Sequence, residues 1–364
     1  MNPICHHTLF LSLTILFGCD SSGTSGQGDE GGSSGSSGST TSSNVGGGGQ
    51  GGAGSAGGGS TSSGGGGATP TKPIYVIGGQ DQRHIVSEDG SNWIEDTYIA
   101  PNGADNAYAG GAVGNGAIVL TGDPGVLRST DGHTWTSIVL PEATSLHSSK
   151  VVAAAGVFVM VSGNHAFKSS DGLTWAHAGD TGDAGHWQAI AYGNAHWVAI
   201  GDGHVKASED GLAWHDYNAT PNNPQLDALA FGNGVFVGVG KANNLARIAT
   251  SPDGVTWTEQ APVTTLYDSG FGGIAFGDGK FLASDCCNAF ESTDGVTWTK
   301  RGDGVQGGIA FAGGKFVGAG WRTEARLFND STGDFESTLT GDQPNQYDSG
   351  QLAPWFTAVV AGEL

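Results

Sequence analysis

Short apolar runs with interspersed small residues recur through most of the chain. Residues 228–233 (Ala-Leu-Ala-Phe-Gly-Asn) and 235–240 (Val-Phe-Val-Gly-Val-Gly) are typical, and related pairs of runs occur at regular intervals. Short runs bounded by Gly and Asn predict β-strands, and their small residues suit strands that lie near a crowded axis. The pattern therefore predicts an all-β fold built from strand pairs.

A polar heptapeptide of the form Ser-x-Asp-Gly-x-x-Trp follows each pair of runs and recurs at regular intervals along the chain. Copies start at residues 87, 129, 169, 208, 251 and 292, and a decayed seventh (Asn-Asp-Ser-Thr-Gly-Asp-Phe) starts at residue 329. A repeat of about 40 residues with turn signals and short apolar runs indicates a propeller blade of four strands. Seven copies predict a seven-bladed β-propeller.

The two ends of the repeat region predict how the ring closes. Residues 74–79 (Ile-Tyr-Val-Ile-Gly-Gly) match the second run of a blade, so the first blade lacks its inner strand. Residues 356–362 (Phe-Thr-Ala-Val-Val-Ala-Gly) match that missing strand. We therefore expect the C-terminal strand to complete the N-terminal blade, which removes the free edges of an open stack.

The N-terminal part of the sequence has a different character. Residues 9–17 are apolar but too few to span a bilayer, which is typical of a signal peptide. The sequence Leu-Phe-Gly-Cys at 16–19 resembles the lipobox of bacterial lipoproteins, although no Lys or Arg precedes the apolar run. This resemblance implies a lipoprotein signal peptide at 1–18 and lipid on Cys19, which would anchor the chain in a membrane. The alternative is a reduced Cys19 that ends a simple signal peptide.

Composition separates a tether from a folded region. The chain has 66 Gly among 364 residues, and residues 20–70 consist mostly of Gly and Ser. Such a segment cannot bury enough apolar surface to fold, so we expect 19–70 to be the lipidated Cys followed by a disordered linker, and 71–364 to be the propeller. The formal net charge of −21 argues against nucleic acid and against electrostatic docking on anionic lipid.

The heptapeptide resembles the Asp-box of BNR propellers, the sialidase-like family, with one residue fewer between Asp and Gly, as in many bacterial BNR-like lipoproteins. The resemblance covers the whole of 71–364 and implies that the box is a folding device. Its Asp would accept N–H bonds in the turn, its Gly would adopt a positive φ, and its Trp would pack beside the next blade. In this family the boxes lie on the face opposite the usual ligand site.

That opposite face would be built from the connections between second and third strands and from the connections between blades. Four residues before the box, His165 and His204 occupy matching positions in neighbouring blades, so we expect them to lie within reach of one shared ligand. The candidate ligand-contacting residues in this set of connections are Arg83, His84, His165, His204, Arg247, Asp285, Asn288 and Arg326.

Adjacent Cys286 and Cys287 are the other unusual feature of these connections. After removal of Cys5 and lipidation of Cys19 they are the only thiols left, and an oxidising envelope compartment favours a vicinal disulfide. Two separate thiols are the alternative.

The functional expectation is a non-catalytic recognition scaffold. The N-terminal Phe/Tyr-Arg-Ile-Pro motif of sialidases is absent, and no metal-ligand spacing such as His-Glu-x-x-His occurs. We therefore assign no catalytic residue, no metal ligand and no cofactor, and expect a monomer that binds a protein or a glycan, as the similar photosystem assembly propellers bind proteins. The expected location is the cell envelope, at the outer membrane or cell surface rather than the inner membrane. A sialidase-like glycoside hydrolase and a metal-binding envelope protein are the alternatives.

Overall fold

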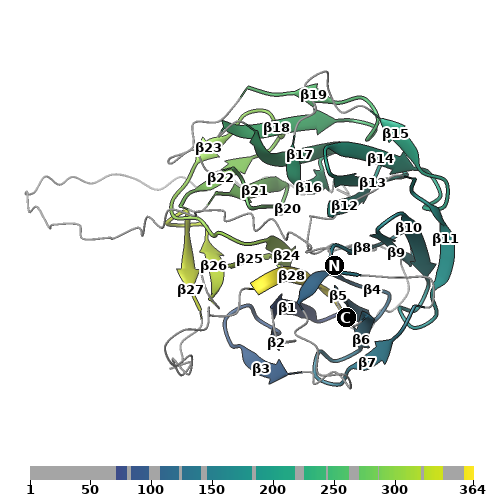
Figure 1. Ribbon diagram of the computed structural model, residues 1–364. Helices are drawn as coiled ribbons and strands as arrows, with labels where there is room; N and C mark the ends of the chain where they lie inside the picture. Colours follow the sequence, from purple (N-terminus) through teal and green to yellow (C-terminus); the bar gives the residue numbers. More distant parts are fainter. Residues whose placement is uncertain are drawn as a thin grey trace, which may run out of the picture. The chain divides into compact units, whose positions relative to one another are not determined.

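Seven four-stranded antiparallel sheets surround a common axis (Figure 1). The computed structural model describes residues 71–79, 83–97, 107–122, 125–140, 146–182, 186–217, 225–242, 245–261, 270–285, 287–320, 324–338 and 356–364. The predicted all-β seven-bladed propeller is confirmed. The described residues include no helical segment with the length and apolar character that a membrane span requires.

Each blade has four strands, which are arranged in order from the axis outward. The innermost strands are β28 (Phe356–Glu363), β4 (Tyr108–Gly114), β8 (Lys150–Ala154), β12 (Trp187–Gly193), β16 (Leu226–Gly232), β20 (Gly273–Gly277) and β24 (Ile309–Ala312). The second strands are β1 (Pro73–Gly79), β5 (Ala117–Gly122), β9 (Val157–Ser162), β13 (His196–Gly201), β17 (Val235–Ala242), β21 (Lys280–Ser284) and β25 (Lys315–Ala319).

The outer half of each blade contains the strands on either side of the box. The third strands are β2 (Arg83–Ser87), β6 (Gly125–Ser129), β10 (His165–Ser169), β14 (His204–Ser208), β18 (Leu245–Ser251), β22 (Ala289–Ser292) and β26 (Ala325–Asn329). The fourth strands are β3 (Ile94–Thr97), β7 (Thr136–Ile138), β11 (Ala176–Asp180), β15 (His215–Tyr217), β19 (Thr258–Glu259), β23 (Thr299–Lys300) and β27 (Asp334–Ser337).

The first blade joins the two ends of the propeller. Its strand order is β28-β1-β2-β3, and β28 pairs with β1 from Pro73↔Glu363 to Ile77↔Val359 and beyond. Reciprocal backbone bonds between Lys72 and Leu364, at 3.0 and 2.9 Å, extend the ladder. The expected ring closure is therefore confirmed.

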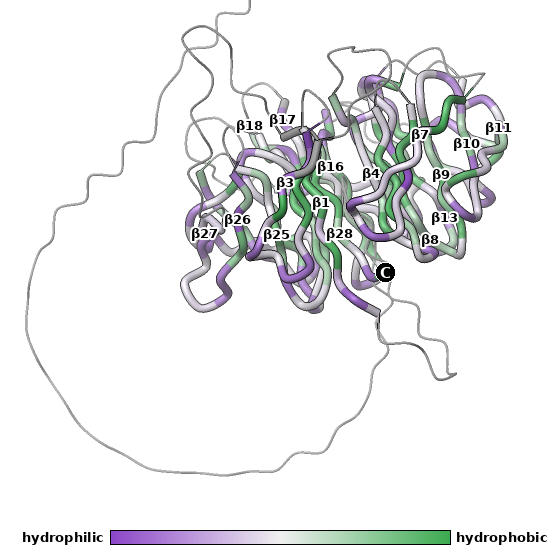
Figure 2. Tube along the Cα trace, turned by 90° about the horizontal axis from the view of Figure 1, so that it is seen from below, coloured by the Kyte–Doolittle hydropathy of each residue, from purple (hydrophilic) through white to green (hydrophobic). Residues whose placement is uncertain are grey.

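Small residues let the inner strands approach one another. A Cβ added to Gly232 would lie 2.1 Å from the ring of Phe276 in the following blade, and one added to Gly277 would lie 2.2 Å from Phe311. Phe231, Phe276 and Phe311 thus each cover a glycine of the preceding blade. Figure 2 shows the result along the chain: apolar positions concentrate within the strands, and polar positions concentrate at the turns.

The boxes form the turns between third and fourth strands. In blade five, which contains β16–β19, Ser251 ends β18 and its hydroxyl accepts the N–H of Gly254 at 2.8 Å. One carboxylate oxygen of Asp253 accepts the N–H groups of Val255 and Thr256, at 2.8 and 2.7 Å, and Gly254 has a φ of 76°. The expected roles of the box Asp and Gly are confirmed, because the turn's otherwise orphaned donors are satisfied locally.

The box tryptophans pack in the opposite direction from the one expected. The indole N–H of Trp257 donates to the carbonyl of Gly254 at 3.0 Å, and the ring lies in the core shared with blade four, β12–β15. Gly254 faces the same neighbour, since a Cβ there would lie 2.3 Å from Val198. The expectation that the Trp packs beside the next blade is wrong: Trp257 packs against the preceding one.

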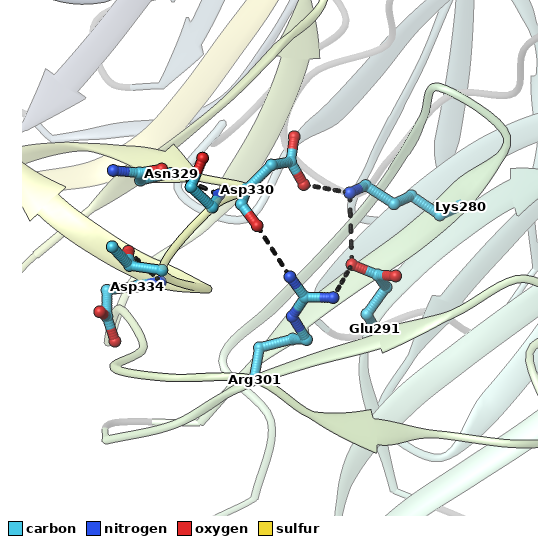
Figure 3. Close-up of polar contacts among 8 residues, drawn as sticks. Lys280, Glu291, Arg301, Asn329, Asp330 and Asp334 are labelled. Carbon is cyan, nitrogen blue, oxygen red and sulfur yellow. Dashed lines mark hydrogen bonds and ion pairs between the residues drawn. The ribbon is translucent and has the colours of Figure 1, made fainter. Parts of the chain in front are cut away.

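Ionic contacts from blade six, β20–β23, hold the decayed seventh box at 329–335 (Figure 3). Lys280 pairs with Asp330 and also lies 3.2 Å from the Glu291 carboxylate. Arg301 lies 3.3 Å from Glu291 and donates to the backbone carbonyl of Asp330 at 2.9 Å. These contacts connect blades six and seven where the box sequence has diverged.

Candidate functional site

The candidate residues lie at the end of the propeller opposite the boxes. In a four-stranded antiparallel meander, the connection between second and third strands is at the opposite end from the box turn. Arg83, His165 and His204 are the first residues of their third strands. Asp285 and Asn288 lie in the connection between β21 and β22.

Each of the three candidate arginines pairs with a glutamate of its own blade. The Nε of Arg83 lies 2.7 Å from Glu95, and the Nη2 of Arg326 lies 2.8 Å from Glu324. Arg247 pairs in the same way with Glu259 on the outer strand. The guanidinium groups therefore already hold carboxylates within the protein.

His84 lies in the core rather than at the surface. It has 0% exposure, and its ring makes edge contacts with Tyr108 and Trp135, at centroid distances of 6.1 and 5.0 Å. Tyr108 and Trp135 belong to blade two, β4–β7. His84 therefore contributes to packing between the first two blades.

Asp285 and Asn288 are both buried and bind each other. One Asp285 carboxylate oxygen accepts the backbone N–H groups of Cys287 and Asn288, at 2.7 and 2.6 Å, and the Asn288 amide lies 3.1 Å away. This carboxylate closes the turn between β21 and β22. Cys286 lies outside the described residues, so the vicinal disulfide with Cys287 stays a prediction.

The two candidate histidines each have partners within their own blade. His204 Nδ1 lies 3.5 Å from Asp216, whose other oxygen accepts from Lys206 at 2.8 Å. His165 Nδ1 lies 3.1 Å from Asp180 and 3.2 Å from His177 Nε2. Within the part of the chain that the structure describes, no hydrogen bond joins His165 to His204, and their shared ligand stays a prediction.

Sequence reasoning missed three polar residues on the inner strands near the same end: Lys150, Gln188 and Asp227. Burial lowers the pKa of Lys150 to about 8, and its ammonium donates to the carbonyl of Ala109. Desolvation by the surrounding protein raises the pKa of Asp227. The sequence signal for these three residues was a single polar residue at the start of an otherwise apolar run, as in Trp-Gln-Ala and Leu-Asp-Ala.

Comparisons with known proteins agree with the fold. No protein-family model and no curated protein matches the chain. It is similar to the solved structure of Ycf48 from Cyanidioschyzon merolae, with 15% identity and a TM-score of 0.51, over 69% of this chain and 94% of that one. The solved structure of Ycf48 bound to D1 peptide has 16% identity and a TM-score of 0.49, over the same shares of the two chains. The GH74 enzyme of Niastella koreensis has 14% identity and a TM-score of 0.44, over 69% of this chain and 42% of that enzyme.

The chain is thus a seven-bladed β-propeller whose fold is similar, at low identity, to that of Ycf48 from Cyanidioschyzon merolae. Likeness at this identity defines the fold alone, because one fold supports many different sites.

Proposed function

We propose that this chain is a non-catalytic recognition propeller of the cell envelope, anchored by lipid on Cys19. The end opposite the boxes would bind a protein or glycan. The observation that carries this proposal is the pairing of the three candidate arginines with Glu95, Glu259 and Glu324.

The arginine pairs bear directly on the hydrolase alternative. A sialidase-like site needs three guanidinium groups that converge on one substrate carboxylate. Here each of these guanidinium groups already binds a carboxylate of its own blade, so a substrate carboxylate would have to displace three internal partners. The arrangement favours recognition over hydrolysis.

Charge and tethering indicate the kind of recognition. A chain with a formal net charge of −21 attracts cationic surfaces and repels anionic ones, which favours a partner with basic segments. A flexible linker of about 50 residues has an r.m.s. reach of roughly 40 Å, enough to hold the propeller clear of a membrane. The partner would then be a basic protein surface or a glycan within the envelope.

Binding to separated components tests the proposal. The chain from residue 20 onward would be applied to a glycan array and to envelope extract at low and high salt, and each hit would be remeasured with the purified component. Asp227→Asn at the candidate end should weaken binding at least tenfold, whereas His133→Ala in an exposed box turn should leave it unchanged. Loss of binding in the box variant alone would overturn the assignment of the face.

A fluorogenic sialoside and glycoside panel tests the alternative directly. We expect no turnover by the purified chain. A sialidase-like reaction uses a tyrosine nucleophile, and the sequence offers Tyr267 and Tyr347, which lie outside the described residues. Turnover that disappears with Tyr267→Phe or Tyr347→Phe would overturn the non-catalytic assignment.

A further inference from the structure

Three potential metal-ligand atoms lie close together on the outer half of blade three, β8–β11. His165 Nδ1 is 3.2 Å from His177 Nε2 and 3.1 Å from Asp180 Oδ1, and His177 Nε2 is 3.3 Å from the same oxygen. The side chains come from the adjacent strands β10 and β11. The three atoms thus form a nearly equilateral triangle.

A β-bulge brings the three side chains to one side of the sheet. Residues three apart in a regular strand, such as His177 and Asp180, point to opposite faces. The register between β10 and β11 shifts here: Ala166 is opposite Gly179 and Phe167 is opposite His177, so one extra residue is inserted in β11. Bulges re-aim side chains in this way, and they concentrate near functional sites.

Gly179 fits this bulge for two reasons. Its φ is 141°, a conformation that residues with a side chain rarely adopt. A Cβ at this position would also lie 2.4 Å from the backbone oxygen of Leu212 in blade four. Glycine is therefore the residue that fits this bulge position.

Hydrogen bonds alone leave the triangle incompletely satisfied. Each facing imidazole nitrogen carries at most one proton, and an ionised Asp180 carries none. If both nitrogens donate to Asp180, no proton lies between His165 and His177. If one nitrogen donates to the other, one imidazole loses its bond to the carboxylate. A single cation at the centre would bind all three atoms at once.

We infer that His165, His177 and Asp180 bind a first-row divalent cation, with zinc as the best match to two imidazoles and a carboxylate. Metal–ligand bonds of about 2.0–2.2 Å at tetrahedral angles place ligand atoms about 3.3–3.5 Å apart, close to the separations here. The Asp180 side chain is 64% exposed, so the remaining coordination position faces water. The site shares His165 with the candidate ligand-contacting residues, but this inference does not rest on the proposed recognition function.

The neighbouring blade provides an internal contrast. In blade four, Lys206 occupies the position of Phe167 and Asp216 occupies the position of His177. The Lys206 ammonium already lies 2.8 Å from the Asp216 carboxylate, beside His204. Blade three has an apolar ring at that position, and in the described residues no lysine or arginine pairs with Asp180. Blade four neutralises its carboxylate with its own lysine, whereas Asp180 of blade three faces two imidazoles among the described residues.

Calorimetric titration of the metal-free, untagged chain from residue 20 onward with Zn²⁺ tests the site. We expect one equivalent to bind at pH 7.5, with affinity at least tenfold lower in His177→Ala and in Asp180→Asn. His204→Ala is the matched control, because it removes an imidazole beside a carboxylate in the next blade, and it should bind as the parent does. Absence of stoichiometric binding by the parent would overturn the inference.

Spectroscopy and pH distinguish a built site from scattered surface histidines. Co²⁺ should give a visible d–d spectrum that disappears in His177→Ala and persists in His204→Ala. Zinc affinity should fall as the pH is lowered, because protons compete with the metal for the imidazole nitrogens. Equal loss of the cobalt spectrum in both variants would assign the metal to nonspecific surface binding and overturn the site.

Discussion

Removal of the C-terminal strand would test how the propeller holds itself closed. In β28, Val359 packs in the core shared with blade seven, β24–β27, and Val360 packs in the core shared with blade two. Their exposures are 1% and 0%. Deletion of 356–364 would remove both side chains and leave β1 without its partner along the axis.

The magnitude follows from these two side chains. Burial of one valine contributes about 1.5–3 kcal/mol, so the pair contributes about 3–6 kcal/mol before the ladder with β1 is considered. A whole domain is stable by only about 5–15 kcal/mol. The truncated chain should therefore lose its cooperative unfolding transition. The graded variant Val360→Ala should cost about 2–3 kcal/mol, because it also leaves a cavity.

Scanning calorimetry with matched deletions is the appropriate assay. Deletion of the Gly/Ser segment at 20–69 should leave the Tm unchanged, and a synthetic peptide of residues 356–364 should restore a transition to the truncated chain. A truncated chain that keeps the parental Tm and enthalpy would refute the closure reasoning, since β28 would then contribute nothing to the ring.

Three further predictions concern packing, pH and anchoring. Gly232→Ala places a Cβ 2.1 Å from the Phe276 ring, so it should destabilise the propeller by about 1–3 kcal/mol, and an unchanged denaturant midpoint would contradict this. Backbone N–H bonds from Thr134 and His133 lower the pKa of Asp131 to about 2, below the value near 4 of an unfolded chain, so this stabilisation is complete above pH 4 and is lost as the pH falls from 4 to 2. A Tm that is constant over that range would be inconsistent with the bonds. Cys19→Ser should release the chain from membranes in fractionation, and association that survives a high-salt wash would indicate a second attachment.

The fold could be predicted because its determinants are local and repeated. Each box begins at the last residue of a third strand, as Ser169 does in β10, and its Ser, Asp and Gly satisfy one turn without help from distant residues. Closure was predictable for a related reason. The runs at 74–79 and 356–362 each match one strand of a blade, and together they complete it.

The direction of the tryptophan packing depends on longer-range geometry. The spacing of the repeats is the same whichever neighbouring blade the tryptophan contacts. The spacing therefore does not predict that Trp257 packs against blade four. His84 shows a similar limit. Its place after Gln82 and Arg83 in the sequence predicted an exposed connection and did not indicate Trp135, which covers His84 from the next blade.

The histidine triangle depended on a register shift. His177 and Asp180 were overlooked because their odd spacing, in a regular strand, separates them across the sheet. The bulge in β11 that reverses this arrangement is visible in the sequence only as Gly179, one glycine among 66. Interactions between strands, rather than the strands themselves, decide which polar side chains meet.

The two ends of the propeller use polar side chains for different purposes, and this difference separates effects on stability from effects on binding. At the box end, the carboxylate of Asp131 is bonded to the backbone of its own turn, so its loss should change stability first. Toward the other end, Lys150 and Asp227 have pKa values shifted by burial and desolvation, and no turn requires their charge. Groups with perturbed pKa values outside the box turns are candidates for ligand contacts. Substitutions that leave the Tm intact and alter binding should therefore concentrate at the end opposite the boxes.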